Sequence, residues 1–244
     1  MKTTPVIELR NVTKCFSHSS PPAVTALEFT AGAGEVVGML GENGAGKTTT
    51  LRMIAGLIRP SSGQVLVNGH DTQHEPSQTR RSVGALFGGA VGLYDRLSGR
   101  ENIRYFADLN GLSAPDAHGC TNDLIELLDM QSFADRRVAE YSSGMKQRTA
   151  LARALVHQPK ILLLDEPTTG LDIRSATIVQ RFVQRRKSEG KLILVSSHNI
   201  EELETLCDRV LILHSGQLRH VAYRDETGAY ALRDLYSQIV ESTG

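Results

Sequence analysis

The segment from Gly41 to Thr48 constrains the fold of this 244-residue chain more than any other feature. It reads GENGAGKT, follows the apolar run VVGML and precedes a stretch compatible with a helix, which is the order that a phosphate-binding loop requires. Glycines let such a loop turn tightly and direct backbone N–H groups at phosphate oxygens, and the helix N-terminus adds a partial positive charge. The alternative is a glycine-rich turn that merely ends in lysine, and the flanking strand and helix favour the phosphate loop.

This loop predicts a set of nucleotide-binding residues. We expect Lys47 to reach the β- and γ-phosphates and the Thr48 hydroxyl to ligate magnesium. The expected nucleotide-binding residues of the loop are Gly41, Asn43, Gly44, Gly46, Lys47, Thr48 and Thr49.

A second candidate site lies where an apolar run, residues 161–164, ends in Asp165 and Glu166. The carboxyl edge of a parallel sheet is where ligands of such folds bind. We expect Asp165 to hold magnesium through water, and Glu166 to polarise the water that attacks the γ-phosphate. The alternative is a buried strand that ends in two solvated acids, and the phosphate loop in the same chain argues against it.

Short apolar or β-branched runs recur along the chain, several of them too uniformly apolar to have a face in water. Helix-like patterns lie between some of these runs, as at residues 47–55 and 173–187. This alternation predicts an α/β nucleotide-binding fold with a mainly parallel sheet. The predicted strands are residues 6–9, 36–40, 64–67, 83–86, 161–164, 192–196 and 210–213.

The stretch 95–157 behaves differently, because it offers helix-like segments and no convincing strand. We predict one domain whose nucleotide-binding core comprises residues 1–94 and 158–244, with 95–157 as an inserted all-helical lobe. The helical segments expected in the lobe are 100–110, 116–129 and 144–157, and the irregular segments expected in the core are 18–22, 59–63 and 70–78.

Composition excludes several classes of protein. The cysteines Cys15, Cys120 and Cys207 are far apart and odd in number, which argues against a disulfide framework and a zinc site and favours a reducing cytosol. Lys+Arg 27 balances Asp+Glu 27, so no global basic field would hold nucleic acid. No apolar run approaches the roughly 20 residues of a membrane span, and the start lacks the apolar core of a signal peptide. Any membrane role is therefore expected from outside the lipid.

Three further segments complete a recognisable order of motifs. YSSGMKQR (Tyr141 to Arg148) lies between the two candidate sites, and PTTGLD (Pro167 to Asp172) and VSSH (Val195 to His198) follow them. In this order the motifs resemble the ATP-binding cassette (ABC) ATPases over nearly the whole chain. The resemblance implies a P-loop NTPase core with an antiparallel β subdomain and an inserted helical lobe, and a head-to-tail dimer around two molecules of ATP with Mg²⁺.

The same resemblance implies roles for individual residues. Ser142 and Gly144 would contact ATP across the dimer interface, Asp172 would link the two sites, and His198 would contact the γ-phosphate. Taken alone, YSSG and Asp172 would each be an ordinary helix cap, and His198 a strand-end residue. Phe16 occupies the position of an aromatic residue that stacks on adenine, and core packing is the equally weighted alternative.

Two departures from the family pattern affect these expectations. Gly88 aligns with a glutamine that senses magnesium and the attacking water, and a glycine offers no side chain for this. The signature segment has Ser143 for a glycine and Met145 for the usual glutamine. FGGAVGLYDRL and YSSGMKQR together resemble the sodium-exporter-type and drug-exporter-type subunits, which work with a separate permease chain.

The expected function is therefore that of an ATPase subunit at the cytoplasmic face of the cell membrane. A transmembrane permease and a second ABC ATPase subunit, in a homodimer or heterodimer, are the expected partners. The alternatives are a soluble cassette ATPase of repair or translation, disfavoured by the single cassette, neutral charge and lack of a long heptad tract, and a non-catalytic nucleotide-binding regulator. The residues name no transported substrate.

Overall fold

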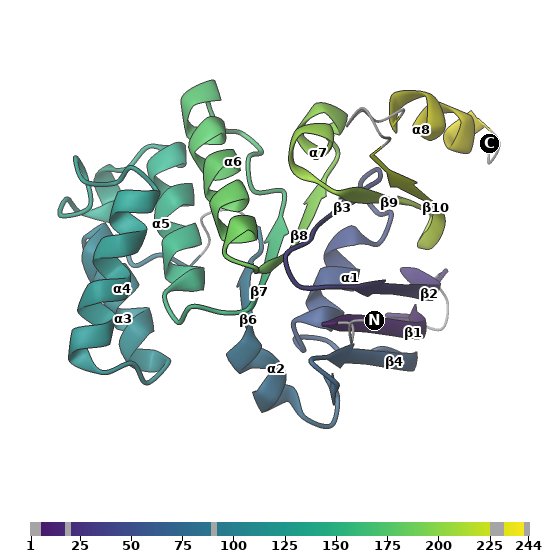
Figure 1. Cartoon of the computed structure of the whole chain (residues 1–244), viewed down its shortest axis with the longest axis horizontal. Coiled ribbons are helices and arrows are strands. Elements are labelled where there is room, and N and C mark those ends of the chain that lie inside the picture. Colours follow the sequence, from purple (N-terminus) through teal and green to yellow (C-terminus); the bar gives the residue numbers. More distant parts are fainter. Residues whose placement is uncertain (1–5, 18–20, 89–91, 225–231, 242–244) are drawn as a thin grey trace.

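Two β-sheets and a set of helices form the chain, and the helices α3, α4 and α5 gather at one end of it (Figure 1). The computed structural model describes residues 6–17, 21–88, 92–224 and 232–241. The loop predicted at 18–22 therefore lies largely outside the described residues, as does part of the segment that follows Gly88.

The larger sheet has six strands in the order β10-β9-β3-β8-β7-β6. The five strands from β9 to β6 are parallel, and β10 pairs antiparallel with β9. Every residue of β3, β7 and β8 is buried, as their uniformly apolar sequences predict for strands covered on both faces. The six strands are β3 (Val36–Leu40), β6 (Val83–Leu86), β7 (Ile161–Asp165), β8 (Leu192–Ser197), β9 (Arg209–His214) and β10 (Gln217–Tyr223).

The smaller sheet is antiparallel, with the order β2-β1-β4-β5, and confirms the expected antiparallel β subdomain. Its strands are β1 (Ile7–Lys14), β2 (Val24–Ala31), β4 (Ser62–Val67) and β5 (His70–Asp71). Buried and exposed residues alternate over most of β2, which is the pattern of a strand with one solvated face. Strand β2 contains no wholly apolar run, so the sequence analysis did not predict it.

The helices expected from the sequence are present, with ends shifted by one or two residues. They are α1 (Lys47–Ile54), α3 (Gly99–Leu109), α4 (Ala114–Leu127), α5 (Ser143–Leu155) and α6 (Ile173–Ser188). A capping box fixes the start of α3, where the Ser98 side chain accepts a hydrogen bond from Glu101 N–H and Glu101 accepts one from Ser98 N–H.

Four further helical elements were not predicted: α2 (Pro76–Ser82), η1 (Val138–Glu140), α7 (Ile200–Leu206) and α8 (Leu232–Glu241). The prediction of an irregular segment at 70–78 holds only for residues 72–75, because β5 and the start of α2 occupy the two ends of the segment. Helix α2 buries only Thr79, so it has no apolar stripe for a sequence pattern to reveal. No strand falls within 95–157, a range that the structure describes completely; the division into core and lobe stays a prediction.

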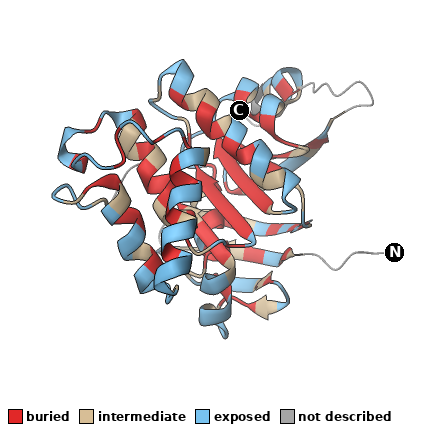
Figure 2. Cartoon of the chain, turned by 60° about the vertical axis from the view of Figure 1, so that its left-hand side comes forward, coloured by how far each residue is buried: buried red, intermediate tan, exposed pale blue. Residues whose placement is uncertain are grey.

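The core lies on both faces of the larger sheet (Figure 2). Helices cover one face, and α1 together with the smaller sheet covers the other. Along β3 the side chains alternate between two hydrophobic clusters, with Val36 and Leu40 in one and Val37 and Met39 in the other. This burial fixes the C-terminal end of β3, from which the phosphate loop departs. Among the described residues, no helix is both long and apolar enough to span a membrane.

Candidate nucleotide site

The predicted phosphate loop joins β3 to α1 and has the backbone that its glycines permit. Gly44 and Gly46 have φ values of 89° and 98°, in the left-handed region that residues with a Cβ avoid. A Cβ at Gly46 would lie 2.6 Å from the carbonyl oxygen of Ala23, and one at Gly41 would lie 2.5 Å from that of Leu213. The loop therefore needs glycine at Gly46 for both its dihedral angle and its close approach to neighbouring backbone.

Lys47 is the first residue of α1 and is only 6% exposed. Its ammonium group donates hydrogen bonds to the carbonyl oxygens of Gly41 and, at 3.2 Å, of Glu42. The same nitrogen lies 3.8 Å from Oε1 of Glu166. These contacts bend the side chain back over the loop, where its charge faces the space that the loop encloses.

Asp165 is the last residue of β7 and meets Thr48 from the neighbouring helix α1. The Thr48 hydroxyl donates to the Asp165 carboxylate at 2.9 Å, and the Ser196 hydroxyl of β8 donates to its other oxygen. The Asp165 carboxylate is buried, and hydroxyl groups of the protein donate a hydrogen bond to each of its two oxygens.

This pair fits a magnesium ion. A hydroxyl and a carboxylate supply the hard oxygen ligands that Mg²⁺ prefers, and such sites complete the shell with waters and substrate phosphates. The described residues contain no group of three or more His, Cys, Asp or Glu side chains placed to hold a metal. That is compatible with Mg²⁺ held by one carboxylate, one hydroxyl and the nucleotide.

Glu166 has a φ of 51°, a conformation that costs a non-glycine residue about 1–3 kcal/mol and persists only when its surroundings enforce it. Its N–H donates to the Ser196 carbonyl at 3.0 Å. Its carboxylate oxygen Oε2 accepts a hydrogen bond from Thr169 Oγ1 at 2.9 Å and lies 2.9 Å from Nδ1 of His198. The structure thus brings together Glu166 and His198, which are both expected at the γ-phosphate.

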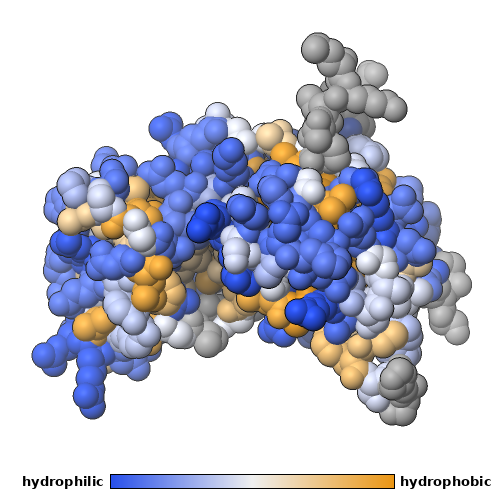
Figure 3. Space-filling model, turned by 90° about the horizontal axis from the view of Figure 1, so that it is seen from below, coloured by the Kyte–Doolittle hydropathy of each residue, from blue (hydrophilic) through white to orange (hydrophobic). Residues whose placement is uncertain are grey.

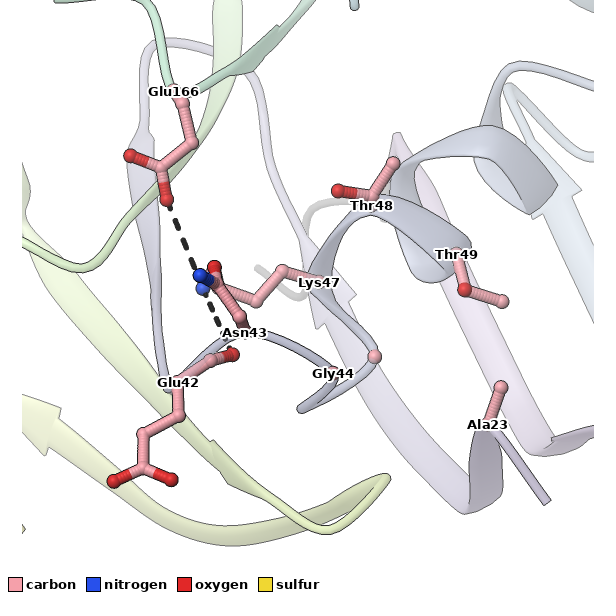
Figure 4. Close-up of a pocket in the computed structure, with 9 residues that line it drawn as sticks. Ala23, Glu42, Asn43, Gly44, Lys47, Thr48, Thr49 and Glu166 are labelled. Carbon is pink, nitrogen blue, oxygen red and sulfur yellow. Dashed lines mark hydrogen bonds and ion pairs between the residues drawn. The ribbon is translucent and has the colours of Figure 1, made fainter. Parts of the chain in front are cut away.

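A cavity of about 210 Å³ opens between the phosphate loop and Glu166. Figure 4 shows Lys47 reaching between the Glu166 carboxylate and the Glu42 carbonyl, with Thr48 and Thr49 on the far side. The sequence motifs did not single out Ala23 and Glu42 as cavity-lining residues, or Ser196 and Thr169 as hydrogen-bond partners of the two acids. The lining residues are Ala23, Glu42, Asn43, Gly44, Gly46, Lys47, Thr48, Thr49 and Glu166.

The signature segment forms a second cluster that does not line this cavity. Ser142 caps α5 by accepting a hydrogen bond from Met145 N–H, and Asp172 caps α6 by accepting one from Ser175 N–H at 2.9 Å. This hydrogen bond, more than any other contact, holds the pKa of Asp172 below its usual range. A Cβ on the buried Gly144 would lie 2.5 Å from Ser175 Oγ, so the starts of α5 and α6 are in close contact. The helix-cap interpretation of both segments is therefore correct within one protomer.

Comparison with known proteins identifies this arrangement. The family model described as ABC transporter matches residues 24–169. A relative from Bacillus subtilis, the ABC transporter ATP-binding protein NatA, is 49% identical over 214 residues, which cover 88% of this chain and 84% of the relative. The chain belongs to the ABC transporter family. It is an ATP-binding subunit of that family and an ATPase.

Other similar proteins agree with this assignment. The Nod factor export ATP-binding protein I of Burkholderia lata is 40% identical, and the match covers 86% of this chain and 68% of that protein. A solved ATP-binding subunit of an ABC transporter superposes with a TM-score of 0.84 at 27% identity, over 96% of this chain and 99% of the other. A dimeric ATP-binding cassette in a post-hydrolysis state with bound ADP and Pi gives a TM-score of 0.80 at 25% identity, and the match covers 89% of this chain and 98% of the other.

Proposed function

We propose that this ABC ATPase powers export by a separate transmembrane permease, working as a dimer at the cytoplasmic face of the cell membrane. The observation that carries the hydrolytic part is that Lys47 and Glu166 line one cavity with His198 against Glu166. The pair Thr48 and Asp165 lies beside them. A similar protein supports export, since the relative from Burkholderia lata is an export ATP-binding protein.

In the proposed reaction the loop backbone and Lys47 bind the β- and γ-phosphates of ATP. Glu166 accepts a hydrogen bond from the attacking water and orients it in line with the γ-phosphate, and His198 holds the Glu166 carboxylate and contacts the γ-phosphate. Magnesium, held by Thr48 and by Asp165 through water, would neutralise charge on the phosphate oxygens. Phosphoryl transfer needs little beyond this positioning and charge stabilisation.

The second subunit, identical or different, would supply Ser142 and Gly144 to the γ-phosphate held by the first. In support, the Ser142 cap leaves this side chain exposed at the start of α5, where a helix N-terminus favours an anion. Asp172 is exposed at the start of α6, and an exposed position is what a residue linking two protomers requires.

Substitution of Phe16 tests how the adenine base of ATP is held. Its side chain is 66% exposed, so the core-packing interpretation is wrong, whereas an exposed aromatic face is available for adenine. We expect Phe16→Ala to raise the KM for ATP roughly three- to tenfold, in line with the 0.5–1.5 kcal/mol of an aromatic pair, and to leave kcat within a factor of two. Steady-state ATPase assays measure both, Phe16→Tyr is the matched control that keeps the ring, and an unchanged KM in the alanine variant would remove Phe16 from the site.

The segment after β6 connects the proposed permease contact to the site. Gly88 has a φ of 65° and offers no side chain to magnesium, and residues 89–91 lie outside the described part. Beyond them, Arg153 of α5 donates a hydrogen bond to the Gly92 carbonyl. The buried Asn102 of α3 accepts from Tyr94 N–H at 2.8 Å and donates to the Tyr94 carbonyl at 3.1 Å. Helices α3 and α5 of the proposed lobe therefore both bind this segment by hydrogen bonds.

We propose that the permease contacts exposed aromatic and aliphatic side chains beside these hydrogen bonds. Tyr94 and Tyr105 pack edge to face with ring centroids 5.3 Å apart, and Leu109 is exposed on the same helix as Tyr105. Figure 3 shows apolar side chains among polar ones over this helical end of the molecule. An exposed apolar group of this kind marks a surface for another protein.

The test is recovery of the permease from solubilised membranes with a tagged chain. We expect a polytopic membrane protein to copurify with the wild type. Tyr105→Ala with Leu109→Ser should lower its recovery about fivefold, because truncation of an aromatic anchor at the centre of an interface costs about 1 kcal/mol or more. Tyr223→Ser, which removes an exposed aromatic side chain from β10, is the control. Recovery of no membrane protein, or hydrolysis stimulated by DNA or RNA, would instead support a soluble cassette ATPase.

A further inference from the structure

The two loops that carry Glu166 and His198 leave the sheet side by side and then lose its support. The last residue pair of the ladder between β7 and β8 is Asp165 with Ser196, followed by one backbone hydrogen bond from Glu166 N–H to the Ser196 carbonyl. Beyond this point the sheet no longer fixes the spacing of the two loops. The direct contact between Glu166 and His198 therefore depends on what else keeps the two loops at this spacing.

The side chain of Glu202, from helix α7, crosses this gap. Its oxygen Oε1 accepts a hydrogen bond from Thr168 Oγ1 at 2.6 Å, and Oε2 accepts one from Ser197 Oγ at 2.7 Å. Thr168 lies two residues after Glu166, and Ser197 directly precedes His198. One carboxylate thus joins the loop after β7 to the last residue of β8, which directly precedes His198.

The start of α7 holds this carboxylate in place. Asn199 caps the helix by accepting a hydrogen bond from Glu202 N–H at 3.2 Å, and its own N–H donates to Ser197 Oγ at 3.0 Å. His198 lies between Ser197 and Asn199, so its backbone is fixed from both sides. The ring that runs from Ser197 through Glu202 and Asn199 sets the direction in which His198 leaves the sheet.

Glu202 is only 5% exposed. Burial, above all, and the negative charge of Glu166 raise its pKa, while the hydroxyl groups of Ser197 and Thr168 act in the opposite direction. A buried carboxylate is costly unless hydrogen bonds satisfy it, and here two hydroxyl groups do so. An apolar residue would fill the same volume without that cost but could not hold two loops by directed bonds.

We propose that Glu202 is a positioning residue for ATP hydrolysis, which sets the spacing between Glu166 and His198 by binding Thr168 and Ser197 together. Glu202 does not line the nucleotide cavity, and Lys47, Thr48 and the loop backbone are held by other contacts. Its loss should therefore affect the hydrolysis step and leave ATP binding nearly intact. This proposal goes beyond the export function and depends only on the ATPase activity of the family.

The first test compares Glu202→Ala, Glu202→Gln and the control Glu201→Gln, which alters an exposed carboxylate of the same helix. We expect Glu202→Ala to lower kcat about 10- to 100-fold, since a displacement of about 1 Å in a catalytic geometry can cost about 100-fold, with the KM for ATP changed less than threefold. Glutamine keeps the length and can bond both hydroxyl groups if one of them turns to accept, so Glu202→Gln should retain at least roughly a third of the wild-type kcat. Glu201→Gln should match the wild type.

A second test uses Thr168→Val, which removes one hydroxyl group at nearly constant volume and keeps the measurement possible if Glu202→Ala fails to fold. We expect this variant to lower kcat, and the double variant Thr168→Val with Glu202→Ala to be no worse than Glu202→Ala alone, because residues of one hydrogen-bond network are not additive. Three results would overturn the proposal: folded Glu202→Ala or Thr168→Val with wild-type kcat, equal losses in Glu202→Ala and Glu202→Gln, or a rise in KM that accounts for the loss. The second of these would assign the effect to the charge of Glu202 instead.

Discussion

Glu166→Gln lowers the kcat of ATP hydrolysis by about 100-fold or more, because a positioned general base contributes about 10²–10⁴-fold. The amide keeps the shape of the side chain but cannot accept a proton from water. It can still accept hydrogen bonds from Thr169 and His198, which contact the carboxylate at 2.9 Å in the wild type. ATP should therefore bind, remain unhydrolysed and hold the proposed dimer together.

The experiment measures magnesium-dependent ATPase rates and, on the same samples, the dimer fraction by size-exclusion chromatography with and without ATP. Glu42→Gln is the matched control, since its carboxylate points away from Lys47 in Figure 4 and the contact with Lys47 is made by the Glu42 carbonyl. Its kcat should stay within threefold of the wild type. Wild-type turnover in Glu166→Gln would exclude Glu166 as the base, and absence of turnover in the wild type would favour the non-catalytic regulator.

Gly46→Ala abolishes measurable ATP binding, which corresponds to a weakening of about 100-fold or more. A residue with a Cβ in the left-handed region costs about 1–2 kcal/mol, and here the added atom would also lie 2.6 Å from the Ala23 carbonyl oxygen. The loop must move to relieve this contact. A moved loop no longer directs its N–H groups and the start of α1 at the phosphates. Fluorescent nucleotide titration measures the loss.

Gly111→Ala is the control for backbone strain alone, because Gly111 has a φ of 77° and open space around the position of a Cβ. It should lower the thermal midpoint by a few degrees, as about 1 kcal/mol does in a chain of this size, and bind ATP as the wild type does. Gly46→Ala with near wild-type affinity would show that the loop tolerates the displacement and that the close contact with Ala23 is not required for binding.

The sequence predicted those parts of the molecule that carry a local pattern. The phosphate loop was predictable because its chemistry requires glycines, a lysine and a threonine in consecutive positions. Strands β3, β7 and β8 were predictable because burial on both faces demands an unbroken apolar run. Glu166 and His198 were each expected at the γ-phosphate, and in the structure Oε2 of Glu166 lies 2.9 Å from Nδ1 of His198.

The parts that were missed depend on contacts that no local pattern encodes. Helix α2 buries a single threonine, so its sequence reads as a loop. Helix α7 has three glutamates, Glu201, Glu202 and Glu204, which are equivalent in sequence. Only the packing of α7 against β3 and β8 buries Glu202 and leaves Glu201 exposed. The tertiary structure therefore decides which of these glutamates binds Thr168 and Ser197.

The glycines of the phosphate loop contact backbone from two different sheets. Gly41 lies against Leu213 at the end of β9, in the larger sheet, and Gly46 lies against Ala23, just before β2 of the smaller one. Residues that never touch a phosphate therefore help to mould the loop. Ala23 is held in turn by its N–H, which donates to the Lys14 carbonyl at the end of β1 at 2.8 Å, so a change that breaks this pairing would reshape the anion-binding loop from outside it.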